Sequence, residues 1–361
     1  MTLKLKRALS YFVKPVILSF IMVAGCTGPA KETLKTTIKQ KEQVPKISPA
    51  KETIKPEKPT MTAPPVPSIE QPEAATLALK FTPQDLTTYK VTIQAERSVK
   101  FEGPLQNKAS FKGGCTGDKI EITFTQQIKN VNEEGSAIAE ITIKQLKYLA
   151  KIKDKLVLDF DSTKEKDPNN PLAKLIGQSY TIEITPWGEV SKIINTSSAR
   201  AQVEGKAPNS KAALRLLSSE AIKKRHTIPA LTEGIIKQPL SKGDSYSKIE
   251  TLSFGMMGSK SYEKIYTLKE INSIDNHQLA LLEMNAIPES TQSDSSFSKM
   301  FDNIETYTGQ LKLDLTTGKV EECLEKLRLE WVVMEPQANQ QEEPNVLRMT
   351  ATRLYHLEKI D

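Results

Sequence analysis

The side chains that most often carry chemistry are few and widely spaced in this sequence. The three histidines, His226, His277 and His356, have no cysteine, carboxylate or second histidine at the spacings that zinc sites use. We therefore expect each of them to be a surface or loop residue. The chain has no G-x-S-x-G elbow, no phosphate-binding glycine loop and no nucleophile beside a base. The sequence thus predicts a non-enzymatic protein without metal or cofactor, with a hydrolase site assembled from distant residues as the alternative.

One acidic run has side chains that suit calcium. Asp159 and Asp161 are followed by Glu165 and Asp167. The run lacks the glycine at the sixth position and the closing bidentate glutamate of the calcium-binding loop. We interpret it as a strand end that enters a polar loop.

The three cysteines fall into two groups. Cys26 follows the small residues Val23, Ala24 and Gly25, whereas Cys115 and Cys323 lie far along the chain. If Cys26 is lipidated, two cysteines remain, and in an oxidising compartment they could form a disulfide. A disulfide needs Cα atoms about 4.4–6.8 Å apart, which spacing in the sequence does not reveal, so paired and free states both stay open.

Residues 1–25 have the three-part layout of a bacterial export signal. Four cations and no acid lie before residue 15, and residues 16–24 are an apolar run. A transmembrane helix needs about 20 apolar residues, so this shorter run is not expected to be a permanent membrane span. Its end, Val23-Ala24-Gly25-Cys26, resembles the lipobox at which the signal peptides of bacterial lipoproteins are recognised.

The resemblance to bacterial lipoproteins implies a role for each residue of this motif. Val23, Ala24 and Gly25 would fit the signal peptidase, and the Cys26 thiol would receive a diacylglycerol before cleavage and further acylation. Two or three acyl chains, at about 0.8 kcal/mol per buried CH₂, hold a protein durably at a membrane. Thr27 stands where some bacteria place an aspartate that retains lipoproteins in the inner membrane, so the outer membrane, facing the periplasm or the cell surface, is favoured. The alternative is an ordinary signal peptide in which Cys26 is incidental.

Residues 26–76 have the composition of a linker. From residue 27 to residue 76 there are nine prolines, eight lysines and six glutamates but no aromatic residue. Such a segment cannot bury enough apolar surface to offset the entropy lost on ordering. We predict a disordered, lipid-anchored tether with an average end-to-end distance of roughly 40 Å, and the alternative is that its lysines bind anionic lipid or cell wall.

Beyond residue 77 apolar and polar residues alternate. The pattern is strict over 120–124, 180–184, 311–315 and 327–331. Period two with polar residues between apolar ones predicts strands with one wet and one dry face, and sheets of this kind are antiparallel. Gly188 and Gly318 follow turn sequences and mark hairpins. We therefore predict a mainly β (α+β) fold.

The two halves of this β-rich region resemble each other. Two strands around the turn Glu134-Gly135 have a counterpart around Asp275-Asn276, and Gly177-Gln178 before a strand is matched by Gly309-Gln310. We predict two repeated antiparallel curved-sheet units, 77–206 and 227–361.

One helix is expected between the repeats, over 207–226. Asn209 or Ser210 would cap its start. Its last turn contains Lys223, Lys224 and Arg225, and cations at this end suit the helix dipole. We prefer that interpretation to a partner-binding basic patch.

Several short motifs, 171–177, 184–190, Ile228-Pro229 and 242–246, resemble an uncharacterised bacterial domain-of-unknown-function family of secreted proteins and lipoproteins. The resemblance covers most of 78–335, and the family usually has Trp where this chain has Tyr246. It implies an envelope location and a β-rich fold, with no established activity. A looser resemblance is to the half-barrels of bacterial lipoprotein carriers, in which an incomplete barrel folds around acyl chains beneath a helix.

The net charge of +6 comes from the N-terminal segments, because residues 77–361 hold 38 basic and 38 acidic residues. This balance argues against nucleic acid as a partner. We predict a lipid-anchored protein of the bacterial cell envelope whose domain binds a hydrophobic ligand in a concave sheet, or an envelope partner. A carrier would need an apolar concavity of a few hundred Å³. The alternatives are a structural spacer between membrane and cell wall, and the hydrolase mentioned above.

Overall fold

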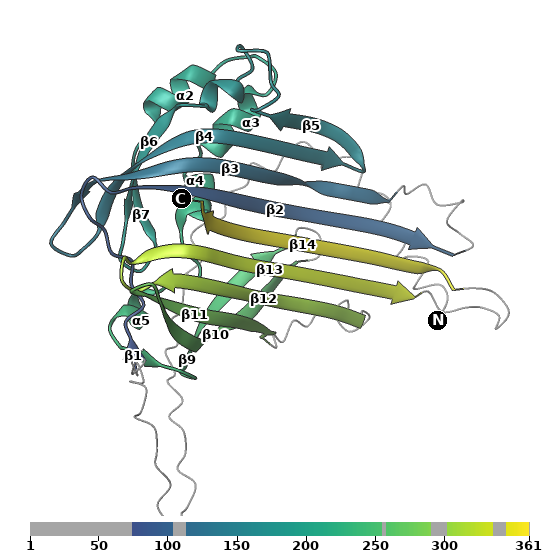
Figure 1. Ribbon diagram of the computed structural model, residues 1–361. Coiled ribbons are helices and arrows are strands. Elements are labelled where there is room, and N and C mark those ends of the chain that lie inside the picture. Colours follow the sequence, from purple (N-terminus) through teal and green to yellow (C-terminus); the bar gives the residue numbers. More distant parts are fainter. Residues whose placement is uncertain (1–73, 104–112, 255–257, 290–301, 335–343, 361) are drawn as a thin grey trace, which may run out of the picture.

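One curved antiparallel sheet of 12 strands is the frame of the protein (Figure 1). The computed structural model describes residues 74–103, 113–254, 258–289, 302–334 and 344–360. The lipobox-like motif and residues 1–73 lie outside this part of the chain. The predicted mainly β, antiparallel fold is confirmed, and the sheet is not closed into a barrel.

The sheet has a first half and a second half that follow the order of the chain. The first half consists of β2 (Leu86–Glu102), β3 (Gly114–Val131), β4 (Ala137–Ile152), β5 (Lys155–Asp161), β6 (Ser179–Ile184) and β7 (Val190–Asn195). The second half consists of β9 (Ser245–Ser253), β10 (Ser259–Ile274), β11 (His277–Pro288), β12 (Asp302–Asp314), β13 (Lys319–Met334) and β14 (Val346–Lys359). A small separate sheet pairs β1 (Ala74–Ala75) with β8 (Leu240–Ser241).

The strand order is β7-β6-β4-β3-β2-β14-β13-β12-β11-β10-β9, with β5 beside β4. The chain therefore starts at the centre with β2 and moves outward to β7. It then crosses to the opposite edge and returns from β9 to β14, which pairs with β2 from Glu102↔Val346 to Tyr89↔Lys359. The two halves thus share one continuous sheet.

The alternating segments form the expected half-buried strands. Tyr180, Ile182 and Ile184 are buried on one face of β6. Leu327, Leu329 and Trp331 are likewise buried on β13. Apolar side chains at every second position can all point to one side of a strand, and the core lies on that side.

The predicted hairpins are present at Gly188 and Gly318. Both glycines have left-handed backbone, with φ of 72° and 69°. At Gly318 a Cβ atom would lie 2.2 Å from the backbone nitrogen of Lys80. Only glycine fits there, because the backbone at Lys80 crosses this turn.

The connection between the halves is not the single helix expected over 207–226. It contains α2 (Ser197–Val203), α3 (Ser210–Leu216), α4 (Ser219–His226) and α5 (Glu233–Ile236), and a 3₁₀ turn, η2 (Ala173–Leu175), precedes β6. The predicted caps, Asn209 and Ser210, make no capping hydrogen bond. Instead the Ser218 hydroxyl accepts from Ala221 N at 3.2 Å and starts α4. A serine that caps its own helix breaks the long one in two.

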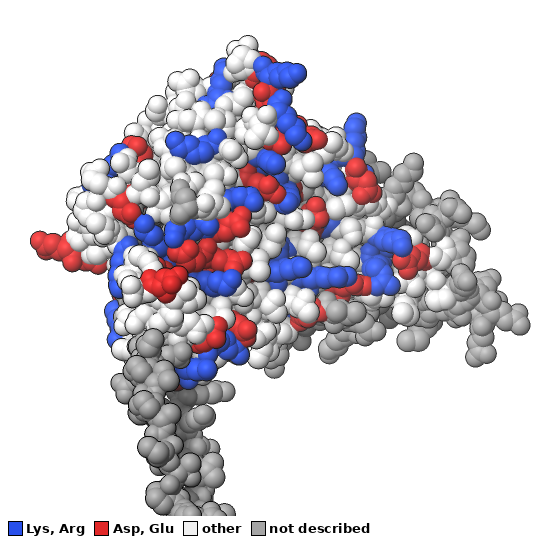
Figure 2. Space-filling view, in the orientation of Figure 1, with Lys and Arg blue, Asp and Glu red and all other residues white. Residues whose placement is uncertain are grey.

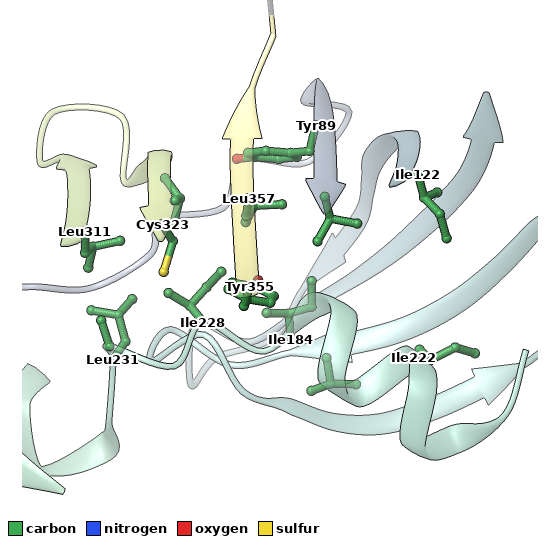
Figure 3. Packing of buried hydrophobic residues seen from close by; sticks show 14 of the residues in the cluster. Tyr89, Ile122, Ile184, Ile222, Ile228, Leu231, Leu311, Cys323, Tyr355 and Leu357 are labelled. Atoms are coloured by element: carbon green, nitrogen blue, oxygen red, sulfur yellow. The ribbon is translucent and has the colours of Figure 1, made fainter. Parts of the chain in front are cut away.

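The apolar core lies on the inner, concave face of the sheet. Ile222 of α4 and the following Ile228 and Leu231 extend toward it, and they pack among residues of both halves (Figure 3). Because the crossing segment contacts both halves, the core is continuous across the sheet.

Charged side chains cover the outer face, with basic and acidic residues interspersed (Figure 2). Cross-strand ion pairs such as Lys90–Glu358 at 3.0 Å and Lys312–Glu322 at 2.7 Å link neighbouring strands. Exposed pairs of this kind contribute about 0–1 kcal/mol each. Within the described residues no helix is long and apolar enough to cross a membrane.

The described residues begin at Ala74, slightly before the expected domain boundary at residue 77. Ala74–Ala75 forms β1, and Leu77 is completely buried. Leu79 N donates to Pro186 O at 2.7 Å, and Lys80 N donates to Gly318 O at 3.2 Å. The predicted tether therefore joins a segment that lies across one end of the sheet.

Candidate functional site

A buried lysine is the centre of a polar cluster inside the second half of the sheet. We call Lys264, Glu250, Glu325, Tyr266 and Tyr307 the lysine cluster. They come from four strands, β9, β10, β12 and β13. On β10 the side chains of Lys264 and Tyr266 share the inward face, because they are two residues apart. The curvature of the sheet brings Glu325 of β13 to them across two intervening strands.

Every polar group of the lysine cluster has a partner. Lys264 Nζ lies 2.7 Å from Glu325 Oε1 and 3.0 Å from Glu250 Oε2, and its side chain is 2% exposed. The Tyr307 hydroxyl is 3.0 Å from both Glu250 Oε2 and Glu325 Oε2. The Tyr266 hydroxyl donates to Glu325 Oε1 at 2.7 Å. A buried charge is tolerated when it is both paired and hydrogen-bonded.

In the lysine cluster the pKa values of the lysine and the tyrosines are raised and that of Glu250 is lowered, so each lies further from pH 7. Burial alone would lower the pKa of Lys264, but the charges of Glu325 and Glu250 outweigh it and raise that pKa. Burial alone would raise the pKa of Glu250, but its interactions with Lys264 outweigh burial and lower that pKa. Burial is the main cause that raises the pKa of Tyr266 and Tyr307. These four groups therefore hold their ordinary charges and are not poised to exchange protons near pH 7.

The lysine cluster extends toward the end of the sheet. Lys260 Nζ lies 2.5 Å from Glu305 Oε2, which also accepts from the Tyr262 hydroxyl at 3.2 Å. The ring of Tyr262 packs edge-on against Tyr307, with centroids 5.4 Å apart. Arg353 of β14 donates to the Ser253 carbonyl of β9. These contacts join strands that are not neighbours in the sheet and hold its curvature.

A second buried polar group lies under the first half. We call Arg225, His226 and Tyr180 the arginine cluster. The Tyr180 hydroxyl is 2.6 Å from His226 Nε2 and accepts from Arg225 at 2.8 Å. A further guanidinium nitrogen of Arg225 donates to Leu216 O at 2.8 Å, and Nε has no recorded partner. Burial lowers the pKa of His226 well below its usual range, with a smaller contribution from Arg225.

An apolar cleft opens at the end of the sheet where residues 77–81 cross it. Its volume is about 530 Å³, counting solvent at the mouth. Its enclosed part has room for only a few water molecules. It is lined mainly by apolar side chains of both halves, including Leu79, Phe81, Tyr89, Phe124, Ile128, Ile184, Ile228, Val320 and Leu357. Figure 3 shows Tyr89, Ile184, Ile228 and Leu357 facing one another from different elements. Lys80, Asp85 and Lys319 also border the cleft, and Lys319 pairs with Asp85 at 2.8 Å.

Part of the described concave face is occupied by the protein itself. Ile222 and Ile228 are 0% and 4% exposed, and they come from the crossing segment rather than from the sheet. The lysine cluster fills the corresponding space of the second half. An acyl carrier would leave such a face open, so the arrangement suits small ligands or surface partners better than enclosed chains.

The two cysteines described by the structure do not meet. Cys115 is beside Ser98 of β2, which pairs with Thr350 of β14, whereas Cys323 is beside Leu357 of the same strand. The stretch from Thr350 to Leu357 alone spans about 23 Å, far beyond the reach of a disulfide. Both thiols are free, so the permitted disulfide is not formed. The lipidation residue Cys26 and its neighbours Val23, Ala24 and Gly25 lie outside the described residues.

The prediction for the histidines is wrong for His226. It is 4% exposed and belongs to the arginine cluster, because α4 turns its last residues inward. His277 and His356 lie on strands and pair with Asp314 at 2.7 Å and Glu322 at 3.1 Å.

The prediction for the basic helix end also needs correction. Lys223, Lys224 and Arg225 do lie in the last turn of α4. However, the Arg225 side chain is 2% exposed and faces the core rather than solvent.

The acidic run that begins at the end of β5 uses Asp161 and Glu165 as acceptors of turn hydrogen bonds. Asp161 Oδ1 accepts from Thr163 N at 3.0 Å, and Glu165 Oε1 accepts from Asp167 N at 2.8 Å. No group of three metal-ligating side chains occurs among the described residues.

Sequence reasoning missed the lysine cluster, although a signal was present. On β10 the inward positions read Tyr262, Lys264 and Tyr266, so a lysine interrupts an otherwise aromatic face. A charge on a dry face predicts a buried partner. The partners, Glu250 and Glu325, come from strands whose proximity depends on the curvature of the sheet.

No family model matches this chain, and no curated protein matches it. Among solved structures, DynF from the dynemicin biosynthesis pathway of Micromonospora chersina aligns with 83% of this chain and 94% of its own length. The identity is 8% and the TM-score is 0.16. A likeness this weak carries no argument about this chain.

Proposed function

We propose that this protein is a lipid-anchored, non-enzymatic component of the bacterial cell envelope whose sheet domain is a binding module for an envelope partner. The motif Val23-Ala24-Gly25-Cys26 supports the anchor, with the outer membrane favoured by Thr27. The observation that carries the binding role is the occupied concave face. Because its own residues fill the part of that face beneath the crossing segment and around the lysine cluster, the domain offers partners its charged outer face, its strand edges and one end cleft.

Native mass spectrometry of the protein purified in mild detergent from cells that produce it tests this proposal. We expect a mature chain that starts at Cys26 and carries the added mass of acyl chains, together with a second polypeptide in fixed stoichiometry. Attached murein would instead support a spacer between membrane and wall. A mature chain without acyl mass would overturn the anchor.

Two matched variants sharpen the anchor test. Cys26→Ala removes the predicted acceptor, and Cys115→Ala removes a cysteine of the folded domain. We expect Cys26→Ala to lose the acyl mass and Cys115→Ala to keep it. Equal acylation of both variants would place the lipid elsewhere.

A small hydrophobic ligand is a second candidate, and the end cleft favours it. Tyr89, Phe124 and Leu357 present an apolar wall, and the lysines at the border are already bonded, Lys80 to Leu315 O and Lys319 to Asp85. A fluorescent naphthylamine probe, displaced by fatty acids, measures occupancy.

Two variants of the end cleft test this second candidate. Val320→Phe would fill the cleft and should abolish binding of the probe, whereas the exposed control Ile274→Phe should leave binding unchanged. Equal binding by both variants would exclude the cleft as the ligand site.

A further inference from the structure

The hairpin that joins β4 to β5 has a rigid tip. Its two turn residues, Lys153 and Asp154, have left-handed φ angles of 49° and 64°, as a tight two-residue hairpin requires. Three hydrogen bonds hold the tip against β3. Asp154 N donates to Cys115 O at 2.8 Å, Asp154 Oδ1 accepts from Cys115 N at 2.9 Å, and Lys153 N donates to Thr116 Oγ1 at 3.0 Å. The tip is therefore fixed in place before it meets any partner.

The tip exposes aliphatic side chains that no core packing explains. Ile152 and Leu156 are each 47% exposed, and Val157 is 50% exposed. Leu156 lies opposite Lys151, the neighbour of Ile152 in β4, so Leu156 and Ile152 point to opposite faces of the hairpin. Both faces of the hairpin therefore show apolar surface to solvent, whereas a strand that only covers a core is dry on one face.

Lysines flank these aliphatic side chains. Lys151 lies opposite Leu156, Lys155 lies opposite Ile152, and Lys153 is in the turn. Among the described residues, none of the three lysine side chains has a recorded ion pair. The carboxylate of Asp154 is directed at the backbone of β3. The tip thus combines positive charge with exposed apolar surface.

We propose that the tip of the β4–β5 hairpin, residues 151–157, docks onto the surface of an anionic lipid bilayer. Ile152, Leu156 and Val157 enter the boundary between head groups and acyl chains, and the lysines contact lipid phosphates. Aliphatic side chains bordered by lysines are the composition of interfacial membrane-binding elements. An added β-strand from another protein fits less well, because lysines on an edge strand oppose such pairing.

The placement of the tip suits a second membrane contact. Figure 1 shows the β4–β5 hairpin at the opposite end of the sheet from β1, which lies near the end of the tether predicted over 26–76. Extended at about 3.1 Å per residue, that tether would reach about 150 Å. It is long enough for the hairpin to touch the membrane that holds Cys26. The docking itself does not rest on acylation, which would only raise the effective concentration of lipid.

A local fluorescent label tests the docking. The full chain with Cys26→Ser and Cys115→Ser keeps only the buried Cys323. Val157→Cys then carries a nitrobenzoxadiazole label at the tip, and Ile274→Cys carries it at a matched exposed position, 54% exposed, at the other end of the sheet. With vesicles of phosphatidylcholine and phosphatidylglycerol we expect brighter, blue-shifted emission from position 157 only. Vesicles of phosphatidylcholine alone should give little change.

Removing the three lysine charges measures how much they contribute to the binding of anionic vesicles. Combining Lys151→Gln, Lys153→Gln and Lys155→Gln should raise the lipid concentration for half-maximal change roughly a hundredfold. High salt should weaken the response of the parent chain without any substitution. The thermal midpoint should stay the same, because these side chains have no recorded ion pair to lose.

Three results would overturn the proposal. One is unchanged emission at position 157 with anionic vesicles, and another is an equal change at positions 157 and 274. The third is a change at position 157 that needs no vesicles and grows with protein concentration. That last result would show that a second copy of the chain occupies the β5 edge.

Discussion

The two halves of the sheet fill the space inside their curvature in different ways. Under the first half lie α3 and α4, whose buried side chains include the apolar Ala213, Leu216 and Ile222 and also Ser210, Arg225 and His226. The second half instead curls until Lys264 of β10 meets Glu325 of β13 and Arg353 of β14 meets the backbone of β9. A curved sheet can thus be filled by a separate element or by its own strands. Both solutions include a buried cation, but only Lys264 in the second half is paired with carboxylates, Glu250 and Glu325, whereas Arg225 is hydrogen-bonded to Tyr180 and Leu216 O.

Tyrosines of the second half support the segment that crosses between the halves. The hydroxyl of Tyr246 donates to Ala230 O, and Tyr266 reaches Pro229 O at 3.3 Å. The hydroxyl of Tyr355 lies 3.3 Å from Thr227 O. Residues after α4 are not helical, so their buried carbonyls need donors from outside the segment.

The largest difference between the halves should follow from removing the buried lysine. Lys264→Met leaves Glu250 and Glu325 close together without their cation, so we expect a loss of about 3–5 kcal/mol in the free energy of unfolding. Urea denaturation measures it. The control Lys269→Met removes an exposed lysine whose partner Glu283 is also exposed, and it should cost less than about 1 kcal/mol. If both variants lost the same free energy of unfolding, the lysine cluster would stabilise the protein no more than an exposed ion pair does.

In the first half the corresponding test is a substitution that creates a cavity in the core. Ile222→Ala removes a fully buried side chain between α4 and the sheet, and we expect about 3 kcal/mol of destabilisation. Ile222→Val should cost about 1 kcal/mol. Because one sheet joins the halves, fluorescence and circular dichroism should report the same unfolding midpoint for Ile222→Ala. Separate midpoints would show that the halves unfold independently.

The halves should also respond to different ranges of pH. Burial lowers the pKa of His226, so below about pH 6.5 the unfolded chain binds a proton that the folded protein does not. Stability should therefore fall by about 1.4 kcal/mol per pH unit as the pH drops from about 6.5 toward the folded pKa. His226→Phe should remove this dependence. A slope that is unchanged in His226→Phe would assign it to another group.

The lysine cluster should lose stability only at lower pH. Although burial opposes the shift, Lys264 lowers the pKa of Glu250. The contribution of Glu250 to the free energy of unfolding is therefore complete above its unfolded pKa, near 4.5. That contribution disappears as the pH falls through the lower folded pKa. Denaturation curves of Glu250→Gln and the parent between pH 3 and 7 check this, and they should converge only in acid.

The smallest effects should come from two tyrosines that join the second half to the crossing segment. Tyr246→Phe removes a donor to Ala230 O, and we expect a loss of about 1 kcal/mol. Tyr355→Phe breaks longer contacts and should cost less. If Tyr246→Phe were as stable as the parent, water would be replacing the hydroxyl at Ala230.

Much of the fold could be predicted from the sequence because its cause is local. Alternation over 180–184 and 327–331 depends only on which residues are apolar, and it predicted the buried faces of β6 and β13 correctly. Gly188 and Gly318 marked hairpins since their backbone conformation favours glycine. The helix over 207–226 was placed in the right region, but Ser218 divides it. The sequence did not indicate this cap, because neighbouring serines and asparagines differ little in the energy with which they cap a helix.

The sequence by itself determined the strands, the turns, the charge balance of the folded part and the motif at Cys26, because each is a property of consecutive residues. Only the tertiary structure decided that β2 pairs with β14, that Cys115 and Cys323 stay apart and that Lys264 meets Glu325. These outcomes depend on how far the sheet curves and where the chain crosses it. Curvature is set by the packing of the whole core at once, so no short stretch of residues encodes it.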